Sequence, residues 1–231
     1  MEILKIIFTI ILILDIPLAI ASFVFAYILL FRRDWRNPIY FNFGMATLSL
    51  GLWIFVTILT YIQNLFLSTY FLETLSFIFG LWILHYFAIF TYKYPYSLKK
   101  DSNIIILLYA VTSLFTLSFL IPDLYIFKSE LRFPFLYNEL NLIGFTLFII
   151  YFSVLSILSF KNLIYKYLNS GGIHKIQLKK IIVGTVVGVI ANLIFSLSIY
   201  YFAPYDFTII GILFASGVLM YIYSIMFSKK I

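Results

Sequence analysis

The sequence contains no cysteine, and charged residues are scarce. Without cysteine, the chain forms neither disulfides nor thiolate metal sites. Charged residues make up 11% of the 231 positions, whereas they make up roughly a quarter of an ordinary soluble domain. A chain with so little charge and 64% hydrophobic residues cannot hide its apolar surface in a water-soluble fold of this size. We therefore expect most of it to lie in lipid.

Several catalytic and cofactor-binding patterns are also missing. There is no glycine-rich phosphate loop, no cluster of metal ligands, and no serine nucleophile beside a plausible base. The last apolar run has no lysine for a retinal Schiff base, and His174 lacks the acidic neighbour and dimeric helix of a kinase phosphoacceptor. The sequence therefore predicts a protein that is not an enzyme and binds no metal or cofactor.

What the sequence does contain is a series of apolar runs. A helix needs about 20 mainly apolar residues to cross a hydrocarbon core of about 30 Å. Backbone groups in lipid must be satisfied within the segment, so such runs should be helices. The fold class predicted is all-α, a bundle of seven transmembrane helices that forms a single domain over residues 1–231. The predicted helices are residues 6–31, 40–62, 66–92, 103–121, 140–160, 181–202 and 207–227.

The first run is predicted to be retained as a helix rather than removed as a signal peptide. It is too long for the apolar core of a signal peptide, it contains Asp15 and Pro17, and it lacks a clear cleavage site.

The positive charges indicate an orientation. Seven crossings place most of the 16 lysine and arginine residues on one side: Arg32, Arg33, Arg36, Lys93, Lys99, Lys100, Lys161, Lys166, Lys175, Lys179, Lys180, Lys229 and Lys230. The other side receives only Lys5, Lys128 and Arg132. The positive-inside rule therefore predicts a multi-pass plasma-membrane protein with the N-terminus outside and the C-terminus in the cytoplasm.

The net charge of +7 predicts a membrane surface rather than nucleic acid as the partner, because the basic clusters alternate with apolar runs. The densest cluster is YKYLNSGGIHKIQLKK, residues 165–180, which is predicted to be the cytoplasmic loop between the fifth and sixth helices. Two roles are open for this loop. It anchors the chain to anionic lipid, or it docks a cytoplasmic signalling protein.

Ionisable residues inside apolar runs usually face the interior of a bundle, because a charge in the bilayer centre is costly. Three such residues are Asp15, Glu73 and His85. Asp15 and Glu73 fall at a similar depth, about 10 to 15 Å below the outer surface at 1.5 Å per residue. Either they line one outward-facing ligand pocket, where one of them takes up a proton or a cation, or they hold helices together separately.

Other polar and small residues suggest helix contacts. His85 and Asn192 are predicted to form hydrogen bonds between helices rather than to bind a ligand. Gly184 and Gly188 in GTVVG allow two helices to approach closely. The outer loop, residues 122–139, partly alternates apolar and polar residues, which predicts a short hairpin or cap over the bundle, or else a solvated loop.

Four stretches resemble a known family, the seven-helix sensor region at the N-terminus of membrane histidine kinases. They are RNPIYFNFGMATLSLGLW at 36–53, LHYFAIFTYKYP at 84–95, HKIQLKKIIVGTVVGVIANLIF at 174–195 and GVLMYIYSIMFSKKI at 217–231. The resemblance implies packing roles for Asn37, Pro38, Trp53, Gln177 and Asn192.

In that family the last helix continues into a dimerising phosphoacceptor domain and an ATPase domain, whereas this sequence stops at Ile231. The resemblance therefore implies a sensor that signals to a separate cytoplasmic protein, unless the chain is part of a longer kinase. One alternative is a small transporter or channel that uses Asp15 and Glu73 to couple protons or cations. A third reading is a structural or assembly factor without a ligand.

Overall fold

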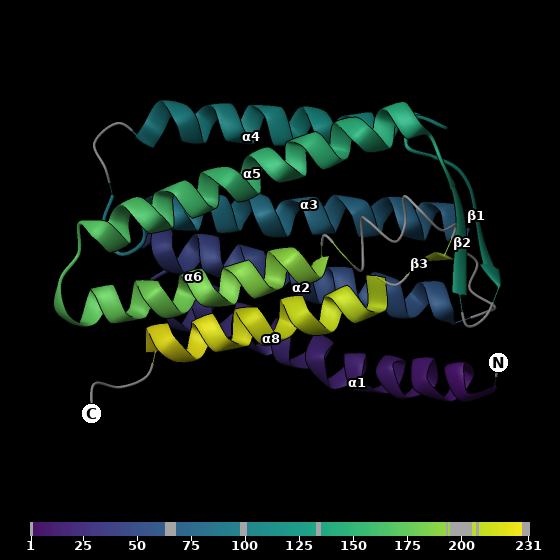
Figure 1. Ribbon diagram of the computed structural model, residues 1–231, viewed down its shortest axis with the longest axis horizontal. Coiled ribbons are helices and arrows are strands. Elements are labelled where there is room, and N and C mark those ends of the chain that lie inside the picture. The colour runs from purple at the N-terminus through teal and green to yellow at the C-terminus, as the bar shows by residue number, and fades with distance from the viewer. Residues whose placement is uncertain are drawn as a thin grey trace.

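The computed structural model describes residues 2–62, 68–97, 101–132, 135–192, 194, 205–206 and 208–227. These residues form a bundle of long helices that run along the longest axis of the molecule (Figure 1). The helices are α1 Glu2–Tyr27, the π-helical turn η1 Ile28–Arg32, α2 Pro38–Tyr61, α3 Thr69–Lys93, α4 Asp101–Ser118, α5 Leu142–Leu168, α6 Gly172–Asn192 and α8 Thr208–Phe227.

The helical bundle confirms the predicted all-α class. Four helical segments are long and apolar enough to cross a membrane: Thr9–Arg32, Pro38–Tyr61, Thr69–Lys93 and Leu142–Leu168. Two further apolar helices in the described part of the chain are shorter, Asn103–Ser118 and Ile210–Ile225. Seven crossings and their direction remain predictions.

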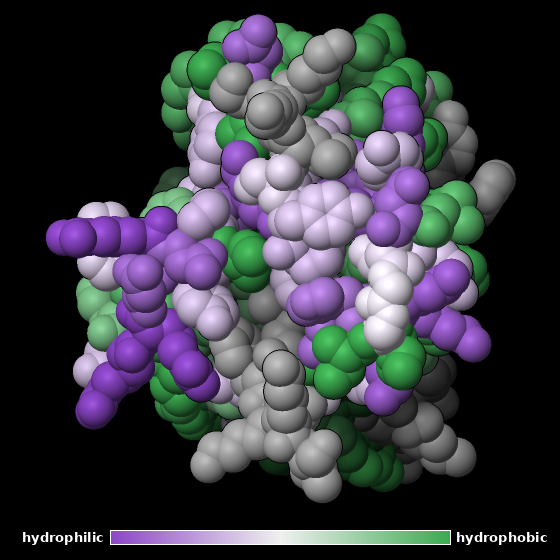
Figure 2. Space-filling view, turned by 90° about the vertical axis from the view of Figure 1, so that its left-hand side faces the viewer, coloured by the Kyte–Doolittle hydropathy of each residue, from purple (hydrophilic) through white to green (hydrophobic). Residues whose placement is uncertain are grey.

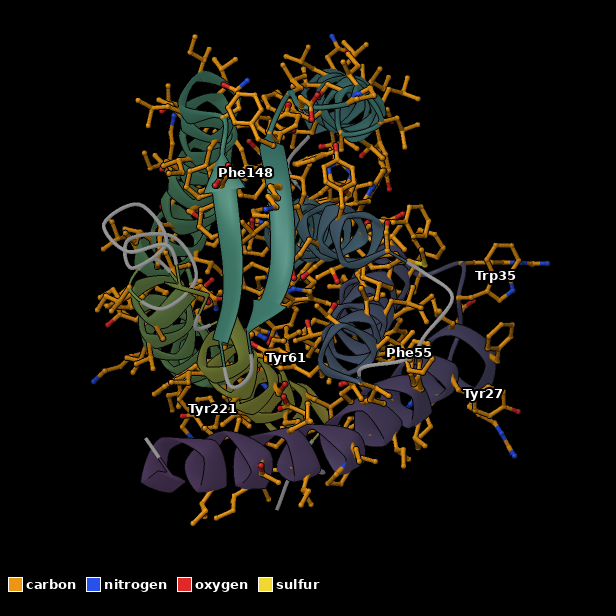
Figure 3. All side chains as sticks on the ribbon, turned by 90° about the vertical axis from the view of Figure 1, so that its right-hand side faces the viewer. Tyr27, Trp35, Phe55, Tyr61, Phe148 and Tyr221 are labelled. Atoms are coloured by element: carbon orange, nitrogen blue, oxygen red, sulfur yellow. The ribbon has the colours of Figure 1, made fainter. Side chains whose placement is uncertain are left out.

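The exterior of the bundle is apolar, as expected of a protein whose solvent is lipid. Large aliphatic side chains such as Ile13, Leu114 and Ile143 are more than half exposed, and large exposed apolar areas are rare on soluble monomers. The aromatic side chains of Tyr27 and Trp35 point away from the bundle (Figure 3). The structure therefore fits a membrane protein.

Helix α3 lies at the centre of the bundle. One buried cluster joins it to α1, α2, α6 and α8 through residues such as Phe43, Trp53 and Phe87. A second cluster joins it to α4 and α5 through residues such as Phe145 and Phe148. Helix α3 therefore contributes residues to both buried clusters.

The connection between α5 and α6 is much shorter than the predicted loop. Helix α5 continues to Leu168 and α6 begins at Gly172, whose φ of +56° suits glycine. Most of the basic stretch 165–180 is therefore helical. The hydropathy of the sequence marked only the apolar part of each helix, and both helices continue beyond it. The end of the predicted helix 181–202, from residue 195, lies outside the described residues.

One end of the bundle carries the predicted hairpin. Strands β1 Ile126–Arg132 and β2 Phe135–Leu140 pair antiparallel, and the short β3 Tyr205–Asp206 adds to β2. The two longer strands lie across the helix ends (Figures 1 and 3). We call this the sheet end. The hairpin prediction for residues 122–139 is confirmed.

The opposite end is hydrophilic, and Figure 2 looks onto it. We call it the basic end because it carries the exposed side chains of Arg32, Arg33, Arg36, Lys161, Lys175, Lys179 and Lys180. Lys99, Lys100, Lys229 and Lys230 of the predicted cytoplasmic set lie outside the described residues. Most of the described basic residues thus lie opposite the sheet, whereas Lys128 and Arg132 lie on β1.

Side-chain caps fix where several helices begin. The Asn37 Oδ1 atom accepts a hydrogen bond from the Ile39 amide at 2.9 Å, and Pro38 occupies the first helical position. Both are favourable at a helix N-terminus. Asn141 caps α5 in the same way and its side-chain amide donates to the Asp123 carbonyl at 3.0 Å. Asn37 and Pro38, which the family resemblance marked for packing, therefore start α2.

Candidate functional site

A cavity with a volume of about 120 Å³ lies between five helices. Trp53 of α2, and residues of α3, α5, α6 and α8, line it. Its walls are mainly apolar and aromatic: Phe77, Ile83, Leu84, Phe87, Phe148, Phe152, Val189, Val218 and Leu219. A mainly apolar cavity with a few polar groups is the usual form of a small-molecule site.

The polar groups of the cavity are Glu73, Ser76, Asn192 and Thr185, together with the indole of Trp53. Glu73 is 4% exposed and lies one turn into α3 from the sheet end. The Trp53 indole donates a hydrogen bond to the Ser76 hydroxyl at 2.7 Å, which joins α2 to α3. The Asn192 side chain donates to the Gly188 carbonyl one turn earlier in α6 at 3.0 Å. Glu73, Ser76 and Asn192 thus place carboxyl, hydroxyl and amide groups on one cavity.

The cavity is elongated along α3. Glu73 and Phe87 both line it, and they are about 21 Å apart along the helix at 1.5 Å per residue. Asn192 is the last residue of α6, which ends near the middle of the bundle (Figure 1), and Thr185 lies two turns farther from the sheet end. The carboxyl and amide groups therefore lie toward the sheet end, and the deeper part is mostly hydrocarbon.

Close packing of α6 on α8 forms one wall. A Cβ atom added to Gly188 would lie 3.2 Å from the Val218 side chain, and one added to Gly184 would lie 3.3 Å from Tyr221. Both distances are tighter than ordinary van der Waals contact. The close approach predicted from GTVVG is confirmed, with α8 as the partner.

Asp15 occupies a different place from Glu73. It is fully buried on α1, which packs against α2 and α8. Neither of its carboxyl oxygens has a hydrogen-bond partner in the described part of the chain. The cavity is lined by Glu73 and not by Asp15. A ligand role for either carboxyl remains a prediction.

His85 belongs to a buried polar network outside the cavity. Its Nδ1 lies 2.8 Å from the Thr112 hydroxyl, which in turn lies 2.7 Å from the Tyr151 hydroxyl. The chain of contacts links α3, α4 and α5. The ring also packs edge-on against Tyr109, with 4.5 Å between centroids. This arrangement matches the predicted role of His85 in hydrogen bonding between helices.

Lys166 has a role that its place in a basic cluster does not suggest. It is fully buried in α5, and its Nζ lies 2.6 to 3.0 Å from four backbone carbonyl oxygens, those of Thr91, Tyr92, Tyr94 and Tyr96. The ammonium has three N–H donors, so two of these carbonyls share one of them. The last carbonyls of a helix lack partners within it and carry partial negative charge. Lys166 therefore fastens α5 to the C-terminal end of α3, and it is not a surface charge.

Gln177 forms a second junction at the basic end. The Tyr94 hydroxyl, directly after α3, donates to its Oε1 at 2.9 Å, and its Nε2 donates to the Ile225 carbonyl in α8 at 3.3 Å. Burial raises the pKa of Tyr94 to about 12, so the hydroxyl remains a donor. Gln177, on α6, therefore connects α3 and α8 close to the last turn of α8.

No family model, curated protein or solved structure matches this chain. The described residues hold no group of three histidine, cysteine, aspartate or glutamate side chains that could bind a metal ion. Of the site residues predicted from sequence, Trp53, Glu73 and Asn192 meet at the cavity, Gln177 lies at the basic end, and Asp15 and His85 lie elsewhere. The role of Lys166 was missed because sequence spacing gives no sign that four carbonyls converge.

Proposed function

We propose that this chain is a sensor of the plasma membrane that binds a small molecule in the cavity and reports it to a separate cytoplasmic protein. This is the function implied by its resemblance to the sensor region of histidine kinases. The sheet end faces outward and the basic end faces the cytoplasm. The exposed arginine and lysine side chains of the basic end contact anionic lipid or the signalling partner.

The observation that carries this proposal is that the same three helices come together at two places, the cavity and the basic end. Helices α3, α6 and α8 line the cavity, and they meet again at Gln177 through its hydrogen bonds to Tyr94 and Ile225. A ligand that separates α6 and α8 from α3 favours a different packing at both places. Ligands shift an equilibrium between two packings when they bind one better. The cavity and the last turn of α8 are thus coupled through shared helices.

The transporter alternative requires Asp15 and Glu73 to act on one path. Only Glu73 lines the described cavity, and Asp15 is buried on α1. No feature of the described residues favours transport over sensing.

Filling the cavity is expected to change the packing at the basic end. A Cβ atom on Gly80 meets only Trp53, at 3.9 Å, so Gly80→Leu places three further carbons in the cavity without a backbone clash. Because the chain lacks cysteine, spin labels can be attached to Lys161→Cys on α5 and Ser224→Cys on α8. We expect Gly80→Leu to shift the distance distribution between these labels, measured by pulsed electron paramagnetic resonance in lipid nanodiscs.

The matched control is Gly217→Leu, since Gly217 is exposed on α8 and a Cβ atom there meets nothing within 4 Å. It should leave the distribution unchanged. Adding Gln177→Ala to Gly80→Leu should reduce the shift, because the junction between α3, α6 and α8 is then lost. An identical distribution for Gly80→Leu and the unmodified protein would rule out coupling between the cavity and the basic end.

A further inference from the structure

We propose that the cavity binds a single-chain amphiphile with a positively charged ammonium head, and that this head lies against Glu73 while the chain extends along α3. This inference rests on the proposed function, because it identifies the class of ligand that the sensor cavity takes.

The shape and size of the cavity suit a ligand with a single alkyl chain. A water-sized molecule needs about 10 to 15 Å³ on this volume scale, so a cavity of about 120 Å³ holds on the order of ten non-hydrogen atoms. It extends along α3 between aromatic and aliphatic side chains, including Phe77, Phe148 and Leu219. Phe148 lies behind the strands at the sheet end (Figure 3). A narrow, long and apolar space fits one alkyl chain of medium length better than a fused ring system.

The polar groups select the head. Among the described residues, Glu73 is the only acidic side chain that lines the cavity, and no lysine, arginine or histidine of that set lines it. A carboxylate accepts hydrogen bonds at about four lone-pair positions, so Glu73 can keep its contacts within the protein and still receive an ammonium group. Ser76 and Asn192 add hydroxyl and amide oxygens on the same cavity. These are acceptors for the several N–H donors of an ammonium.

The same groups disfavour an anionic head. A fatty acid would bring its carboxylate beside Glu73 in a mainly apolar space, and like charges in such contact repel strongly. A long-chain alcohol has one donor and no charge, so it should bind with intermediate strength. Three ligands with the same alkyl chain and different head groups should therefore differ in affinity according to the charge of the head.

The test uses decylamine, decanol and decanoate as probes on the protein in nanodiscs. Isothermal titration calorimetry measures binding, and protein-free nanodiscs correct for partition into lipid. In the unmodified protein we expect decylamine to bind with a dissociation constant about tenfold below that of decanol, with decanoate weakest, since charge-assisted hydrogen bonds are roughly twice as strong as neutral ones. This ranking needs no variant.

Two variants separate the possible failures. Glu73→Gln should raise the dissociation constant of decylamine about tenfold and change that of decanol by less than about threefold, since only the charged contact is lost. Retained decanol binding would show that the cavity is intact. Gly80→Leu should weaken the binding of decylamine and of decanol to the same extent. Gly217→Leu, the control, should leave the binding of both unchanged. Equal affinities for decylamine and decanoate in the unmodified protein would overturn the ammonium head alone. Absence of binding by every probe, or no effect of Gly80→Leu, would overturn the cavity as a ligand site and the proposed function with it.

Discussion

Replacing Lys166 with methionine is expected to lower the free energy of unfolding by about 3 kcal/mol, because buried carbonyls that lose a charged donor are left without a hydrogen bond. Methionine has a similar length, so the change removes the ammonium with little change in volume. The carbonyls of Thr91, Tyr92, Tyr94 and Tyr96 then lose the donor that they share in the native protein. A buried acceptor without a donor is costly.

The measurement is thermal unfolding in one detergent, followed by circular dichroism. A loss of this size lowers the midpoint by on the order of 10 °C in a chain of this length. Lys161→Met is the matched control, because Lys161 is exposed on the same helix; we expect a change within about 0.5 kcal/mol. If the two variants unfold at the same temperature, Lys166 does not fasten α5 to α3.

Replacing Gly144 with alanine is expected to cost at least about 3 kcal/mol, the upper range for inserting atoms into a packed interior. Gly144 is buried in the first turn of α5, and its Cβ would overlap the backbone carbonyl oxygen of Leu124. Rotating a side chain cannot relieve a clash with backbone. Either the turn that precedes β1 or the first turn of α5 must move, and the hydrogen bond from Asn141 to the Asp123 carbonyl is strained in both cases.

Two measurements detect this effect. The midpoint of thermal unfolding should fall, and limited proteolysis should cut Gly144→Ala within residues 121–132 faster than the unmodified protein. Gly217→Ala is the control, because α8 has open space there and alanine favours a helix over glycine by up to about 1 kcal/mol. Equal protease resistance of Gly144→Ala and the unmodified protein would show that this close approach does not hold the sheet end.

Hydropathy predicted the helices of this bundle well, because the requirement to satisfy backbone groups in lipid is local to each segment. Boundaries failed where helices extend past the apolar run, as in α5 to Leu168 and α6 from Gly172. The hairpin at residues 126–140 was predictable because alternation of side chains is also a local pattern. Such local patterns predict which segments form helices or strands, but they do not predict which faces of the helices pack against one another.

The candidate site was predictable only in part for this reason. Depth along a helix placed Asp15 and Glu73 at one level, but the direction in which each side chain points depends on how the helices rotate and pack. Glu73 lines the cavity and Asp15 packs elsewhere on α1. Lys166 was placed among surface charges because the acceptors that surround it come from the chain segment at the end of α3, 70 to 75 positions away. No spacing in the sequence indicates such a contact.

The most direct test of the account is the compartment that each end of the bundle faces. Because the native chain has no cysteine, single cysteines introduced at the exposed positions Phe127 on β1 and Lys179 on α6 can be labelled with a membrane-impermeant maleimide. In intact cells, Phe127→Cys is expected to react and Lys179→Cys to react only after permeabilisation. Reaction of both positions in intact cells, or of Lys179→Cys alone, would contradict an outward sheet end and a cytoplasmic basic end.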